Sequence, residues 1–128
     1  MTREGLTPTH TAPCDRGPWM PQYDVHVNPG PMRDTVPMVV VVQSSLFDDY
    51  RRRVVVPLVL RSALPGRHAM TGTRMNPVFK IKGKTVVLHP LDMVSVALNQ
   101  LGPCVGNLAE QGQQIADALD ELLTRSWS

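Results

Sequence analysis

The sequence is poor in aromatic residues and in long apolar runs, and both shortages exclude a class of protein. Aromatic side chains make up 5% of the 128 residues, too few for the stacking platform by which many proteins bind single-stranded nucleic acid. No apolar run approaches the roughly 18 residues of a membrane span, and the first residues lack the apolar core of a secretory signal. We therefore expect one soluble, cytoplasmic domain.

Cysteine is scarce as well, occurring only at Cys14 and Cys104. Two cysteines so far apart make neither a disulfide framework nor the spacing of a metal site, and we expect two free thiols in a reducing compartment. The histidines are scattered, without a pair on one helical turn or a carboxylate at a ligand spacing. The sequence predicts neither a metal site nor a cofactor.

Acidic residues are missing between Tyr50 and Leu91. That stretch instead carries a series of cations: Arg51, Arg52, Arg53, Arg61, Arg67, Arg74, Lys80, Lys82 and Lys84. The segment from Asn107 is acidic, with Glu110, Asp117, Asp120 and Glu121. Two interpretations stay open: a solvated basic face balanced by an acidic helix, or a surface that attracts an acidic partner, protein or nucleic acid.

The N-terminal part differs in composition from the remainder. Residues 1–20 are polar and rich in proline and show no periodicity, so we expect a disordered extension. Met20 directly precedes the first strand-like pattern and is a candidate natural start. The folded domain is expected to span residues 21–128.

Strand patterns follow one another from residue 23 onward. The alternating residues 23–27 predict a strand with one wet face, which includes His26. Two β-branched runs, 37–42 and 54–60, enclose a polar connection that contains the apolar pair Leu46 and Phe47. Residues 78–82 and 85–88 predict a hairpin with its turn at Gly83-Lys84, and residues 93–98 a short strand or buried turn.

A helical period replaces the strand pattern at the C-terminus. Leu108, Ile115, Leu119 and Leu122 fall on one face, with Ala116, Ala118 and Leu123 widening the stripe. Asn107 and Glu110 have the spacing of a capping box. We predict a helix over residues 108–123, and hence a mainly β fold of antiparallel strands followed by one helix. No catalytic constellation is recognisable in the sequence.

The order of several motifs resembles the CcdB toxin family. The motifs are Gln22–Val25, Val42–Ser44, Arg53–Leu58, Asn76–Phe79, Met93–Val96, Leu101-Gly102, and the helical segments 108–110 and 115–120. Together they cover the chain from about Pro21 to Leu123 in family order.

The resemblance implies a small SH3-like antiparallel β-barrel of the CcdB/MazF kind, closed by a C-terminal helix and assembled as a homodimer. It implies a non-enzymatic toxin of a toxin–antitoxin module that poisons DNA gyrase by binding its A subunit. A cognate CcdA-like antitoxin would neutralise the toxin and repress the operon with it, so that operator DNA is contacted only through the antitoxin complex.

The resemblance also implies where gyrase is bound. The matching positions are Leu46, Phe47, Asp120, Leu123, Thr124, Arg125, Ser126 and Trp127. Well-known members end in Trp-Gly-Ile, whereas here Thr124, Arg125 and Ser126 occupy those positions and Trp127 follows three positions late. The indole of Trp127 is either a displaced hot spot or a terminal residue without a role.

Two alternatives to gyrase poisoning remain. One is an endoribonuclease of the MazF type, in which the basic stretch Arg51–Lys84 binds RNA phosphates. The other is an inactive remnant that folds and dimerises but has no target.

Overall fold

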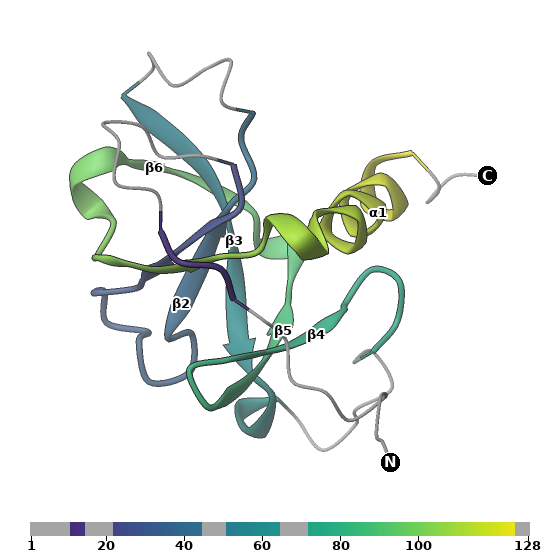
Figure 1. Ribbon diagram of the computed structural model, residues 1–128, viewed down its shortest axis with the longest axis horizontal. Helices are drawn as coiled ribbons and strands as arrows, with labels where there is room; N and C mark the ends of the chain where they lie inside the picture. Colours follow the sequence, from purple (N-terminus) through teal and green to yellow (C-terminus); the bar gives the residue numbers. More distant parts are fainter. Residues whose placement is uncertain (1–10, 15–21, 45–50, 65–71, 125–128) are drawn as a thin grey trace.

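Seven antiparallel strands and one α-helix make up the part of the chain that the computed structural model describes, residues 11–14, 22–44, 51–64 and 72–124 (Figure 1). The strands are β1 (Asp24–Val27), β2 (Met38–Val41), β3 (Arg52–Leu60), β4 (Val78–Ile81), β5 (Lys84–Leu88), β6 (Val94–Ala97) and β7 (Cys104–Asn107). Short 3₁₀ helices span Arg61–Ala63, Pro90–Asp92, Leu98–Gln100 and Ala109–Gln111, and α1 spans Gly112–Leu123. The prediction of a mainly β fold with a C-terminal helix is confirmed.

The long strand β3 organises the sheet. One of its edges pairs with β2, and the other pairs first with β6 and then with β5. The strand order is β4-β5-β3-β2-β1-β7, with β6 attached to β3. Because two strands share one edge of β3 in succession, the sheet curls into the small, barrel-like form that the family resemblance implied (Figure 1).

Pro57 lies in β3 at the point where the partner strand changes. Proline has no N–H to donate and is normally excluded from a central strand. Its carbonyl accepts a hydrogen bond from the N–H of His89, at 3.1 Å, in the segment between β5 and β6. The missing donor therefore falls in the gap between two ladders, where it interrupts neither of them.

The buried core contains side chains of the curled sheet together with Ile115 and Ala118 of α1, and α1 lies at one side of the sheet (Figure 1). The largest fully buried side chains of the core include Phe79, Leu58, Ile81, Leu88, Leu108 and Ile115. In α1, Ile115 and Ala118 are fully buried, whereas Leu123 is 62% exposed and Ala116 is also exposed. The predicted apolar stripe is thus correct in its centre and wrong for Ala116 and Leu123. Within the described residues, no helix is long and apolar enough to cross a bilayer.

Three features of the structure depart most clearly from the prediction. The β4–β5 turn is formed by Lys82 and Gly83, both at positive φ (52° and 78°), because pairing Ile81 with Lys84 directs Phe79 and Ile81 inward. Strand β7 was not predicted at all. The α-helix begins at Gly112 instead of residue 108, after a 3₁₀ turn in which Oδ1 of Asn107 accepts the N–H of Ala109 at 2.7 Å.

Truncation of Ile115 to alanine should lower the free energy of unfolding by about 2–5 kcal/mol, because it opens a cavity under α1. Leu123→Ala in the same helix is the matched control and should change it by less than about 0.5 kcal/mol, since that side chain is exposed. Urea unfolding of both variants measures the difference. Equal losses of unfolding free energy in the two variants would contradict the packing of the helix described above.

Candidate functional site

The last turn of α1 contains the described members of the predicted partner surface: Asp120, Leu123 and Thr124. The backbone N–H of Thr124 donates to the carbonyl of Asp120 at 2.8 Å, which closes the helix end. The hydroxyl of Thr124 lies 2.8 Å from that carbonyl oxygen and 2.7 Å from Oδ1 of Asp120, within reach of either acceptor. Leu123 is exposed on this hydrogen-bonded turn. It lies beside Asp120 and Thr124, whose side chains are within hydrogen-bond distance of each other.

Arg74 connects this helix to the segment that precedes β4. Its guanidinium lies 3.7 Å from a carboxylate oxygen of Asp117, 3.5 Å from Asp120 and 3.4 Å from Glu121. Acidic side chains near the C-terminal end of a helix are unfavourable to the helix dipole, and a cation offsets them. One cation of the basic stretch thus balances acidic side chains of α1.

The other predicted surface residues, Leu46, Phe47, Arg125, Ser126 and Trp127, lie outside the described residues. The start of the connection that carries Leu46 and Phe47 is fixed nevertheless. Oε1 of Gln43 accepts the N–H of Val54 at 3.2 Å. Gln22 also donates from its side chain to the carbonyl of Val42, at 3.0 Å.

The remaining described cations do not share one location. Arg53 is 2% exposed and donates to the carbonyl of Arg52 at 3.0 Å. Arg52 itself donates to the hydroxyl and the carbonyl of Ser95, at 2.8 and 2.7 Å. The exposed Lys80, Lys82 and Lys84 lie on the β4–β5 hairpin, which pairs with the opposite end of β3. The nine-residue strand β3 thus separates Arg52 and Arg53 from the hairpin lysines by roughly 25–30 Å.

Cys14 and Cys104 form a disulfide, so the prediction of two free thiols is wrong. Residues 11–14, in the stretch expected to be disordered, lie along β7. Ala12 exchanges two backbone hydrogen bonds with Asn107, at 3.1 and 2.8 Å. A Cβ on Gly106 would collide with the side chain of Thr11, so this close approach requires glycine. The Cα atoms of the two cysteines are consequently 6.2 Å apart, within disulfide range. The candidate start at Met20 lies outside the described residues.

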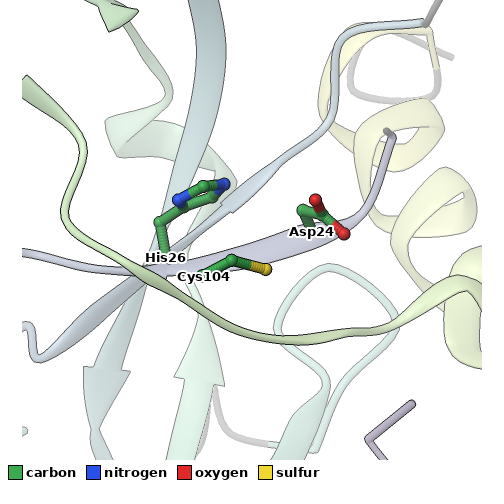
Figure 2. Close-up of side chains that lie close together, drawn as sticks. All are labelled: Asp24, His26 and Cys104. Carbon is green, nitrogen blue, oxygen red and sulfur yellow. The ribbon is translucent and has the colours of Figure 1, made fainter. Parts of the chain in front are cut away.

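His26 is 4% exposed, so its prediction as a wet-face residue is wrong. Its Nδ1 lies 2.9 Å from the carbonyl oxygen of Gly102. Asp24, 3% exposed, lies two residues earlier in β1, and its Oδ1 accepts a hydrogen bond from Nδ2 of Asn107 at 2.8 Å. Figure 2 shows these side chains beside Cys104, and one potential ligand atom from each lies within 4.8 Å of the others. The sequence spacing did not reveal this group, because pairing of β1 with β7 brings Cys104 opposite His26.

Tyr23, which precedes β1 at a positive φ of 74°, packs near the start of α1. Burial raises the pKa of its phenol above the usual value. Burial of the ring therefore favours the neutral phenol.

Replacement of Arg74 by glutamine should lower the free energy of unfolding by roughly 0.5–1 kcal/mol at low salt, because three carboxylates lose their common cation. The loss should shrink at 1 M salt, where such exposed charges are screened. Thermal melts at both salt concentrations measure it, with the exposed Arg61→Gln as the matched control. A loss that is independent of salt would contradict the electrostatic origin.

Comparison with protein families gives one result that bears on function. The family model described as CcdB protein matches residues 22–124, which include every strand, α1 and Thr124. The match begins after the segment that holds Cys14. No curated protein matches the chain.

Proposed function

Since the chain belongs to the CcdB family of gyrase-poisoning toxins of toxin–antitoxin systems, we propose that it binds the A subunit of DNA gyrase and traps the enzyme on DNA. A cognate CcdA-like antitoxin neutralises it in the cytoplasm and joins it in repressing their operon. The active form is a homodimer, and its contact with operator DNA runs through the antitoxin.

The observation that carries the proposal is the extent of the family match. It covers 22–124, the whole barrel and the helix, instead of one motif that unrelated folds share. The matched segment also ends in the turn that exposes Leu123. The proposal thus rests on a match that spans the barrel and the helix together.

The chemistry of that turn suits protein recognition. A large apolar side chain that is 62% exposed loses contact with water when a partner covers it. Asp120 and Thr124 are already held by hydrogen bonds, so binding costs little side-chain ordering there. Leu123 is accordingly the described residue on which gyrase binding depends most.

The endoribonuclease alternative receives less support. Arg53 is buried, and Arg74 forms ion pairs with acidic residues of α1. Two cations of the basic stretch therefore make contacts within the protein. The exposed cations divide between the two ends of β3. Of the two described histidines, His26 is buried and faces the carbonyl of Gly102. The other, His89, lies 3.3 Å from Asp92 in the segment between β5 and β6. An RNA-cleaving site needs a general acid or base beside bound phosphates, and this distribution does not favour one.

Purified protein added to gyrase and relaxed plasmid should inhibit supercoiling and produce gyrase-linked DNA breaks, while cellular RNA incubated with it stays intact. Gel analysis of both nucleic acids gives the result. Degraded RNA with unaffected gyrase would replace the proposal by the endoribonuclease. If both DNA and RNA are unaffected, the chain is an inactive remnant.

Leu123→Ala should weaken gyrase inhibition by roughly tenfold or more, as loss of a hot-spot side chain does, without loss of stability. Met32→Ala is the matched control, because Met32 is 61% exposed and belongs to the β1–β2 connection, away from α1 in Figure 1. Inhibition curves of both variants test the location of the surface. Equal inhibition by the wild type and Leu123→Ala would move the surface away from this turn.

A further inference from the structure

We propose that Asp24, His26, Cys104 and Cys14 bind a zinc ion when the Cys14–Cys104 disulfide is reduced. The ion would join the N-terminal segment to the barrel in place of the covalent bond. The inference concerns the reduced protein, which a cytosolic thiol pool maintains, and it does not depend on gyrase binding.

The strand register brings three of the ligands together. Asp24 and His26 are two residues apart in β1 and therefore project from the same face. Cys104 of β7 lies directly opposite His26. One ligand atom of each residue lies within 4.8 Å of the others (Figure 2). Ligand atoms around tetrahedral zinc are about 3.3–3.8 Å apart, so a contraction of at most about 1.5 Å brings these three atoms to that spacing, and Sγ of Cys14 separates from Sγ of Cys104 once the disulfide is reduced.

The Nδ1 contact of His26 selects, for the neutral ring, the tautomer that a metal ligand needs. A carbonyl can only accept, so the contact of Nδ1 with Gly102 requires the proton on Nδ1. In the neutral ring, Nε2 then carries a lone pair. Within the residues that the structure describes, this buried Nε2 has no hydrogen-bond partner. A ring whose Nδ1–H is held by a backbone carbonyl while Nε2 is unpartnered is arranged as in zinc-bound histidines.

Asp24 is oriented in a comparable way. Nδ2 of Asn107 donates to its Oδ1 at 2.8 Å, and such an outer hydrogen bond is the usual support of a metal-binding carboxylate. Asn107 also exchanges the backbone hydrogen bonds with Ala12 that keep the segment of Cys14 beside β7. The same residue thus positions one ligand directly and another through the backbone.

Reduction frees the two sulfur ligands. The disulfide accepts two electrons and two protons from a dithiol, which becomes a disulfide itself, and Cys14 and Cys104 become thiols. Zinc then displaces the two thiol protons, since the thiolate is the ligand form. The resulting set of two sulfurs, one imidazole and one carboxylate suits zinc better than calcium or magnesium, which prefer oxygen ligands.

The test uses the full chain, reduced with a dithiol and desalted without oxygen. Titration with Co²⁺ should give one equivalent of binding, with visible bands of tetrahedral cobalt and a near-ultraviolet thiolate-to-cobalt charge-transfer band, all abolished by Zn²⁺. His26→Gln and Cys104→Ser should each weaken binding at least about tenfold, because even outer partners of a metal are worth 10- to 100-fold. His89→Gln, a histidine outside the group, is the matched control and should bind as the wild type does.

Absence of the charge-transfer band in the reduced wild type would overturn the proposal. Unchanged affinity in His26→Gln and Cys104→Ser would do the same, because the metal would then be held elsewhere. A second measurement needs no variant: Zn²⁺ should slow alkylation of both thiols in the folded wild type at least about tenfold. Unchanged alkylation would contradict the site even if the variants fail to fold.

Discussion

The pairing of β3 with three strands is the constraint on which the rest of the fold depends. One edge of β3 belongs to β2, and the other is divided between β6 and β5. Pro57 is tolerated in the centre of the sheet because it lies where those two partners meet. The division curls the sheet, and the curl creates the inside that Phe79, Leu58 and Ile115 fill. Helix α1 packs on that core through Ile115, and its last turn is exposed to solvent.

Most of the fold could be predicted from local sequence, and its exceptions have local causes. Runs such as residues 54–60 are rich in β-branched residues, which favour strands wherever they occur. Strand β7 contains Gly106 and Asn107, two residues that are rare in strands, and it forms because β1 and Ala12 pair with it. The burial of Leu123 was predicted wrongly because periodicity assigns a face to a residue but does not say where the core beneath it ends.

The predicted sites differ in how far sequence could define them. The prediction of the partner surface rests on the family resemblance. Its described part, Asp120 to Thr124, is one turn at the end of α1. The group around His26 could not be predicted, because its members meet only through the pairing of β1 and β7 and through a segment outside the family match. Alternation suggested that His26 faces water, whereas it is buried together with Asp24. The pairing of distant strands, which no local pattern encodes, determines both the formation of this group and the burial of its side chains.

The central claim is that this family toxin meets gyrase through the end of α1. Hydrogen–deuterium exchange of the chain, with and without purified gyrase A subunit, tests it most directly. The account predicts slower exchange of amides across Asp117–Thr124 on binding, with the β4–β5 hairpin unchanged. Protection confined to that hairpin, or no protection anywhere, would contradict the claim.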